Sequence, residues 1–113
     1  MPNEIICYIR GNKIIETPEE KVRQEYVRRL VEEYGYPKEI IDVEVPIQLG
    51  RDKTKKADIV VYRTKKDREK RENHYIIIEC KEPKIKFPDG EEQLKSYVNA
   101  TTAQIAVWTN GIE

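Results

Sequence analysis

The sequence predicts one α/β domain in which helices cover both faces of a mixed β-sheet. Two segments repeat apolar residues at helical spacing, and four others are short apolar runs, mostly rich in β-branched residues. In chain order these segments give one helix, three strands, one helix and one strand. A helical crossover before the last strand returns that strand into the same sheet. Because 113 residues suffice for one hydrophobic core, we expect residues 1–113 to form a single domain.

The first helix has the clearest boundaries. Thr17 provides a capping hydroxyl, Pro18 suits the first helical position, and Glu20 completes the capping-box pattern three residues after the cap. Apolar residues then recur every three or four positions until Gly35, which favours termination. The sequence therefore predicts a helix over residues 18–34.

The strands are predicted from shorter signals. The run 75–81 is apolar on both alternating faces until it ends in charge, which is typical of a central strand covered on both sides. Residues 63–73 are highly charged and resemble a flexible segment. The other predicted elements are a hairpin over 5–15 with its turn at Arg10-Gly11-Asn12, strands over 40–47, 57–63 and 103–108, and a second helix over 90–100.

Charge is balanced overall but not along the chain. The 21 basic and 21 acidic side chains cancel, yet between Arg51 and Glu72 ten Lys or Arg stand against five Asp or Glu, a local excess of +5. No segment approaches the ~20 apolar residues of a membrane span, and the N-terminus lacks a secretory pattern. We therefore expect a cytoplasmic protein without membrane contact. Cys7 and Cys80 lie in apolar surroundings and are expected to be buried, reduced thiols.

Two carboxylates and a lysine are the candidate catalytic residues. Asp58 starts one predicted strand and Glu79 closes the next, so neighbouring strand ends place them near one point. Glu79 and Lys81 are two residues apart and project from the same face, while Cys80 points to the other. Hard cations such as Mg²⁺ prefer oxygen ligands, and a nearby lysine can hold an attacking water or stabilise charge on a phosphate.

This arrangement, Asp58 followed by Glu79-Cys80-Lys81, resembles the PD-(D/E)xK nuclease superfamily. An isolated Glu-x-Lys more often ends a strand in solvated charges. Here, however, the next predicted helix carries Gln93 and Tyr97 four residues apart on one face. A Gln-x-x-x-Tyr pair at this place is similar to the RecB-like branch, in which the pair faces the active site. One departure is that Ala57, not proline, precedes Asp58.

A narrower resemblance extends from about Thr17 to the end of the chain. Several motifs occur in the order found in the N-terminal nuclease domain of type I restriction enzyme R subunits, namely Thr17-Pro18-Glu19-Glu20-Lys21-Val22-Arg23, Gly35-Tyr36-Pro37, Ala57-Asp58-Ile59-Val60-Val61, Ile78-Glu79-Cys80-Lys81 and Trp108-Thr109-Asn110-Gly111. The resemblance implies a restriction-endonuclease-like α/β/α sandwich in αβββαβ order, here with an extra N-terminal hairpin. It also implies either a domain cut from a longer R-subunit-like protein or a stand-alone relative.

The same resemblance implies a site and a reaction. Asp58, Glu79 and the backbone carbonyl of Cys80 would bind Mg²⁺, with Mn²⁺ as a substitute, and Lys81 would position the water that hydrolyses a DNA phosphodiester bond. Gln93 and Tyr97 would contact the substrate or orient Lys81. Implied partners are double-stranded DNA, a helicase-like motor in the same chain, and methylation and specificity subunits.

Two residues of the first helix leave alternatives open. Many relatives place a first-helix glutamate beside the metal, and Glu20 lies at the edge of the apolar arc, but its place in the capping box explains it equally well. Arg23 falls inside the apolar arc and so needs a buried partner, for which a site carboxylate is a candidate.

Lysines near the predicted site are candidate DNA contacts, because cation clusters release counterions on binding DNA. These candidates are Lys55, Lys56, Lys84 and Lys95. The basic segment 63–71 is an equal candidate for phosphate binding and for a solvated loop. Two other functions stay open: a nuclease-fold module that binds nucleic acid or protein without cleaving, and an unrelated α/β domain with coincidental charges.

Overall fold

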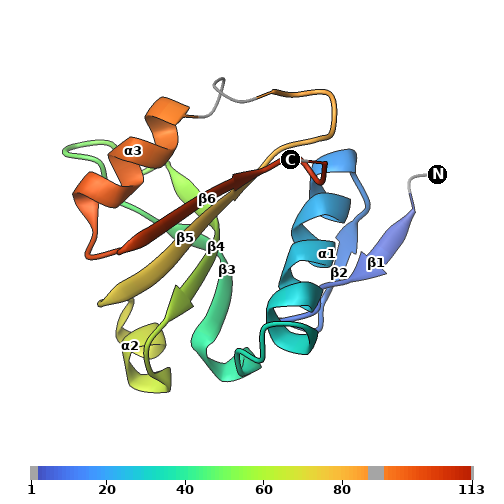
Figure 1. Cartoon of the computed structure of the whole chain (residues 1–113), viewed down its shortest axis with the longest axis horizontal. Coiled ribbons are helices and arrows are strands. Elements are labelled where there is room, and N and C mark those ends of the chain that lie inside the picture. Colours follow the sequence, from blue (N-terminus) through green and yellow to red (C-terminus); the bar gives the residue numbers. More distant parts are fainter. Residues whose placement is uncertain (1–2, 87–90, 113) are drawn as a thin grey trace.

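The computed structural model describes residues 3–86 and 91–112, and it shows a four-stranded mixed sheet between helices, with a separate hairpin beside α1 (Figure 1). In chain order the elements are β1 (Glu4–Ile6), β2 (Lys13–Ile15), α1 (Pro18–Glu32), the 3-10 helix η1 (Lys38–Ile40), β3 (Ile41–Pro46), β4 (Lys56–Tyr62), α2 (Lys65–Lys70), β5 (His74–Cys80), α3 (Glu91–Ala100) and β6 (Ile105–Thr109). The predicted mixed α/β architecture with an N-terminal hairpin is confirmed.

The sheet has the order β3-β4-β5-β6. Strands β3, β4 and β5 pair antiparallel, whereas β6 runs parallel to β5. A parallel neighbour cannot be reached by a tight turn, and the crossover through α3 provides the connection. As predicted, the strand that carries Glu79 is central, because β4 and β6 flank it on its two sides.

Each face of the sheet packs against one long helix. On one face, Val22, Val27 and Leu30 of α1 join a buried cluster with alternate residues of the strands, including Ile59 and Ile78. On the other face, Leu94 and Tyr97 of α3 pack against a second cluster that includes Val60, Tyr62 and Ile77. The alternation of Ile76, Ile77 and Ile78 between these clusters explains why β5 is apolar on both of its faces.

Helix α1 begins where the capping pattern predicted. The Glu20 backbone N–H donates to Thr17 Oγ1 at 3.1 Å, and Pro18 occupies the first turn. The helix ends at Glu32, two residues before the predicted end at 34. Gly35 has φ +77° and the Tyr36 N–H donates to the Leu30 carbonyl at 3.0 Å, a left-handed termination that favours glycine.

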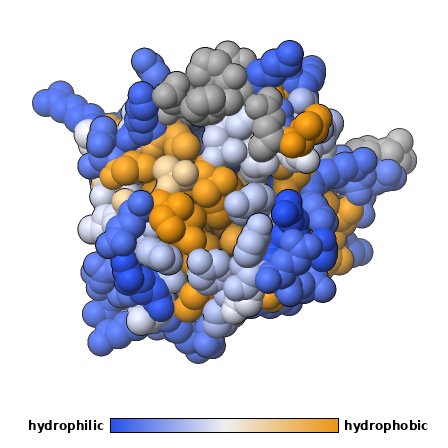
Figure 2. Space-filling view, in the orientation of Figure 1, coloured by the Kyte–Doolittle hydropathy of each residue, from blue (hydrophilic) through white to orange (hydrophobic). Residues whose placement is uncertain are grey.

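The two edge strands of the sheet differ in their protection. Edge strand β3 carries Asp42, Glu44 and Pro46, and Arg10 donates a short hydrogen bond to the Val43 carbonyl. Edge strand β6 has the sequence Ile-Ala-Val-Trp-Thr, and its Ile105 is 41% exposed. In the space-filling view, hydrophobic residues gather over β6 within an otherwise largely hydrophilic face (Figure 2).

Strand β3 switches faces at Glu44. Val43 packs in the α1 cluster and Val45 in the α3 cluster, although residues two apart in a regular strand share a face. Glu44 between them has φ +49°, a left-handed backbone that side chains with a Cβ seldom adopt. The paired residues of β4 follow the same switch, since Ile59 lies in the α1 cluster and Ala57 in the α3 cluster.

Some predicted boundaries and one predicted segment were wrong. Part of the charged stretch 63–73 forms α2, which Thr64 caps by accepting from the Asp67 N–H at 3.1 Å. The segment lacks the apolar periodicity from which a helix can be predicted. The strand predicted from residue 40 starts at Ile41, because Ile40 belongs to η1. The strand predicted to end at residue 81 ends at Cys80, and the last strand starts at Ile105 and not at 103. The hairpin turn extends over residues 7–12, and the predicted helix start at residue 90 lies outside the described residues.

Candidate active site at one end of the sheet

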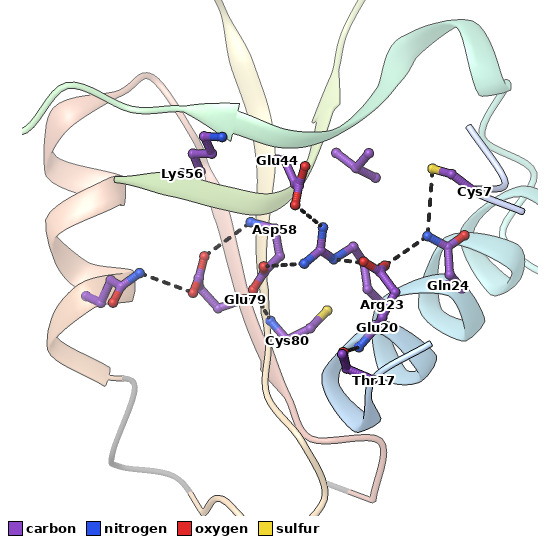
Figure 3. Close-up of polar contacts among 12 residues, drawn as sticks. Cys7, Thr17, Glu20, Arg23, Gln24, Glu44, Lys56, Asp58, Glu79 and Cys80 are labelled. Atoms are coloured by element: carbon purple, nitrogen blue, oxygen red, sulfur yellow. Dashed lines mark hydrogen bonds and ion pairs between the residues drawn. The ribbon is translucent and has the colours of Figure 1, made fainter. Parts of the chain in front are cut away.

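Asp58 and Glu79 lie side by side on antiparallel strands. The register pairs Ile59 of β4 with Ile78 of β5, which brings Asp58 and Glu79 together at the next step of the ladder (Figure 3). The Asp58 N–H donates to Glu79 Oε1 at 3.3 Å, and the Cys80 N–H donates to Asp58 Oδ2 at 2.8 Å. The two carboxylates predicted to converge are therefore neighbours.

Burial and mutual repulsion act on both carboxyls. Glu79 is 2% exposed, and its burial, together with the charge of Asp58, raises its pKa to about 8. Burial also raises the pKa of Asp58, although the Cys80 N–H and the charge of Arg23 act in the opposite direction. Two adjacent buried carboxylates cost free energy when both are ionised, so this pair favours a cation nearby.

Arg23 supplies a positive charge from α1. Its guanidinium lies 3.4 Å from Asp58 Oδ1, 3.3 Å from Glu20 Oε2 and 3.2 Å from Glu44 Oε1 (Figure 3). Arg23 is 8% exposed, and its burial lowers its pKa while the charges of Asp58 and Glu20 raise it, with a net upward shift. The expectation that buried Arg23 pairs with a site carboxylate is confirmed.

Helix α3 reaches the other carboxylate. Gln93 Nε2 donates to Glu79 Oε2 at 3.4 Å and to the Tyr97 hydroxyl at 2.7 Å. The Tyr97 hydroxyl in turn donates to the Lys56 carbonyl at 3.0 Å, and the Tyr97 side chain is fully buried. The spacing of four residues thus aims both side chains at the site, as expected for one helical face. Their contribution to a reaction stays a prediction.

Two further predicted site residues, Lys81 and Glu20, come from β5's C-terminal end and from α1. Lys81 follows β5, its N–H donates to the Thr109 carbonyl at 2.9 Å, and its charge lowers the pKa of both Asp58 and Glu79. The backbone of Glu20 completes the helix cap, whereas its carboxylate contacts Arg23 and accepts from Gln24 Nε2 at 3.0 Å. Glu20 therefore combines a capping backbone with a side chain that reaches the site through Arg23.

The four predicted DNA-contacting lysines are exposed but differ in position. Lys56 starts β4 beside the site (Figure 3), and Lys55 precedes it. Lys84 follows the Glu79 strand and pairs with Glu82 at 3.1 Å. Lys95 lies on α3 two residues after Gln93, so it projects from a different side of the helix.

Two acidic residues near the site were not predicted. Glu44 was assigned only to a strand, and its contact with Arg23 depends on a left-handed backbone that no sequence signal indicated. The charge of Glu19 raises the pKa of both Asp58 and Glu79, so it also lies close. The sequence signal for Glu19 was its place next to Glu20 in the first turn of α1.

The donor chemistry fits a hard divalent cation. Mg²⁺ in proteins is usually held by one or two carboxylates with several waters, and Asp58 and Glu79 offer two adjacent carboxylates. Among the described residues, no group of three or more His, Cys, Asp and Glu side chains is arranged to hold a metal. The backbone carbonyl of Cys80 as a further ligand stays a prediction.

Fold and site together define a mixed α/β domain with a buried carboxylate pair and a following lysine at one end of its central sheet. None of the helices in 3–86 and 91–112 is long and apolar enough to cross a membrane. The family model described as "Type I restriction enzyme R protein N terminus (HSDR_N)" matches residues 18–113. The chain belongs to this family, as its motifs predicted. No curated protein and no solved structure matches the chain.

Proposed function

We propose that this chain is a Mg²⁺-dependent DNA endonuclease domain of a type I restriction system, with a restriction-endonuclease-like α/β/α sandwich of the PD-(D/E)xK type. One observation carries the proposal: the carboxylates of Asp58 and Glu79 each accept a hydrogen bond from the backbone of the neighbouring strand, and Lys81 follows the end of β5. Membership in the R-protein family supports a role in restriction. The antiparallel pair β4 and β5 followed by the α3 crossover agrees with this sandwich.

Each residue has a proposed task. Asp58, Glu79 and the Cys80 carbonyl would hold Mg²⁺, and Mn²⁺ could replace it. When bound, Mg²⁺ would stabilise negative charge on the scissile phosphate. Lys81 lies near enough to both carboxyls for its charge to lower their pKa. From this position it would hold and orient the attacking water. Gln93 would fix the Glu79 carboxylate through its hydrogen bond, and Tyr97 would fix Gln93.

Double-stranded DNA is the proposed substrate, bound in part by Lys55, Lys56, Lys84 and Lys95. A helicase-like motor and the methylation and specificity subunits of a restriction system are the proposed partners, in the cytoplasm. These partners would choose the target, which leaves the domain itself with phosphodiester hydrolysis.

Metal binding and cleavage should separate in two variants. We expect calorimetry with Mn²⁺ to show one site in the wild type and none in Glu79→Ala, because Glu79 would be a ligand. Lys81→Ala should keep Mn²⁺ binding but lose cleavage of supercoiled plasmid with Mg²⁺. Glu69→Ala and Lys70→Ala on the exposed surface of α2 make the same charge changes away from the site and should behave as wild type. Equal Mn²⁺ affinity in wild type and Glu79→Ala would rule out the proposed site.

A second candidate function is nucleic-acid binding without catalysis. It is favoured by one observation, that each carboxylate oxygen of Asp58 and Glu79 already has a protein partner. Under this alternative the chain would bind DNA equally well with Mg²⁺ or with a chelator, and the wild type would not cleave plasmid DNA with Mg²⁺.

A further inference from the structure

Among the described residues, Arg23 is the only cationic side chain that forms an ion pair with the central carboxylate pair, Asp58 and Glu79. Asp58 Oδ2 and Glu79 Oε1 accept from backbone N–H groups that the sheet fixes in place, and Glu79 Oε2 accepts from the neutral amide of Gln93. Asp58 Oδ1 instead faces the guanidinium of Arg23 at 3.4 Å. A long side chain can change rotamer, whereas a strand N–H cannot move without breaking the sheet. Arg23 is therefore the displaceable charged partner.

Arg23 and a metal ion would compete for the same oxygen. A divalent cation at Asp58 would lie within a few ångströms of the guanidinium, and like charges at such distances in a buried setting repel strongly. Only one of the two cations, the guanidinium or the metal ion, can occupy the position closest to the Asp58 carboxylate. The guanidinium must then either leave Asp58 or weaken metal binding.

Glu44 offers Arg23 a place to remain. Its Oε1 lies 3.2 Å from Arg23 Nη1, and the Glu44 side chain is 47% exposed, so this part of the guanidinium contact lies toward the surface. Glu44 reaches this position through a strained backbone with φ +49°, which places it across from Asp58 on the neighbouring strand. Strained residues of this kind concentrate where function requires them.

We propose that Arg23 is a built-in counterion that neutralises Asp58 when no metal is bound, and that a metal ion displaces it toward Glu44. This inference rests on the proposed metal site. Arg23 is a positioning residue here, because it acts through Asp58 and touches neither substrate nor metal. In this arrangement the charge of Arg23 stabilises the acidic site when no metal is bound. The same charge lowers the affinity for the metal, because Arg23 competes for Asp58.

Calorimetry with Mn²⁺ tests the competition. Arg23→Gln should bind Mn²⁺ at least about tenfold more tightly than wild type, a difference of about 1.4 kcal/mol, and should have a lower melting temperature in chelator. Glu44→Gln should bind Mn²⁺ more weakly, because Arg23 then has one partner fewer away from Asp58. Arg10→Gln is the matched control, since Arg10 also contacts Glu44, at 3.9 Å, but it has no ion pair with Asp58. It removes the same charge and should change the affinity less than about threefold at moderate salt.

The outcomes separate the two proposals. If Arg23 only supports the position of a metal ligand, Arg23→Gln will bind Mn²⁺ more weakly than the wild type. Equal Mn²⁺ affinities in the two proteins would also overturn the counterion role, but they would leave the proposed metal site intact. Mn²⁺ binding by Arg23→Gln but not by the wild type would support the counterion role, because Arg23 would then exclude the metal completely. Absence of Mn²⁺ binding in both would overturn the proposed function and this inference together.

A measurement on the unaltered protein keeps the test independent of mutant folding. The Arg23 side-chain N–H signal in NMR should be slow to exchange with solvent in chelator, because the guanidinium is buried among three carboxylates. Titration with Mg²⁺ should shift this signal and speed its exchange. An Arg23 signal that does not change while Mg²⁺ binds would contradict the displacement.

Discussion

Asp58 and Glu79 are each held by the backbone of the other residue's strand. The Asp58 N–H donates to Glu79 Oε1 at 3.3 Å, and the Cys80 N–H, next to Glu79, donates to Asp58 Oδ2 at 2.8 Å. The carboxylates therefore use the hydrogen-bonding geometry of the sheet itself as their support. Both hydrogen bonds are made between β4 and β5, so the sheet sets the separation of the two residues.

The raised pKa of Glu79 predicts how stability depends on pH. Burial and the charge of Asp58 raise this pKa from 4.5 to about 8, so between these values the folded chain binds a proton that the unfolded chain releases. In chelator, the contribution of Glu79 to the free energy of unfolding should be fully present below pH 4.5 and should be lost as the pH rises toward 8, with a slope of at most about 1.4 kcal/mol per pH unit. Urea denaturation at a series of pH values measures the slope. Glu79→Gln should flatten it, and Glu69→Gln should not. An unchanged slope in Glu79→Gln would mean that another group titrates.

Gln93→Ala should separate catalysis from folding. Gln93 is half-buried and donates to Glu79 and Tyr97, but alanine is a good helix residue, so thermal stability should change little. Cleavage of plasmid DNA with Mg²⁺ should fall by at least about tenfold, because the Glu79 carboxylate loses an orienting donor. Ser96→Ala, at an exposed site on the same helix, is the control. A normal cleavage rate in Gln93→Ala would remove the RecB-like assignment of this pair.

The Tyr97 hydroxyl should contribute to stability. Its hydrogen bond to the Lys56 carbonyl ties α3 to the start of β4, and the hydroxyl also accepts from Gln93. Tyr97→Phe keeps the packed ring and removes both bonds, which should lower the free energy of unfolding by about 1 kcal/mol. Urea denaturation measures this change. Tyr34→Phe, where the side chain is exposed, should have no effect. Equal losses in the two variants would show that the buried bonds add nothing.

Both cysteines should be unreactive in the native protein. Cys7 and Cys80 are free and buried, as predicted from their apolar surroundings, and burial raises the pKa of the Cys80 thiol. A colourimetric thiol reagent should label neither residue under native conditions and should label both in denaturant. Rapid labelling of one native thiol would show that its part of the core opens readily.

The sequence predicted those parts of the site that depend on local geometry. Alternation along a strand placed Glu79 and Cys80 on opposite faces, and helical spacing placed Gln93 beside Tyr97. Both rules act over a few residues. The contact of Glu44 with Arg23 instead requires a left-handed backbone within β3, and nothing in a run of β-branched residues indicates which position will adopt it.

The charged segment shows a different limit. Helix α2 has no apolar stripe, and its boundaries depend on the Thr64 cap and on Arg71 in a left-handed conformation with φ +54°. A helix stabilised by its ends gives no periodic signal along its length. Without apolar periodicity beside it, a cap such as Thr64 does not by itself predict a helix, and the charged run 63–73 therefore resembles a flexible segment.

The connection between β4 and β5 lies at the far end of the hairpin from Asp58 and Glu79, and it is where α2 lies in Figure 1. The separation of the two carboxylates is set by ladder pairs such as Ile59 with Ile78, which do not depend on the length of that connection. Lengthening a loop adds only a slowly growing entropic cost. Segments of very different length, or a reporter peptide, could therefore be grafted between Tyr62 and His74 without changing the separation of Asp58 and Glu79.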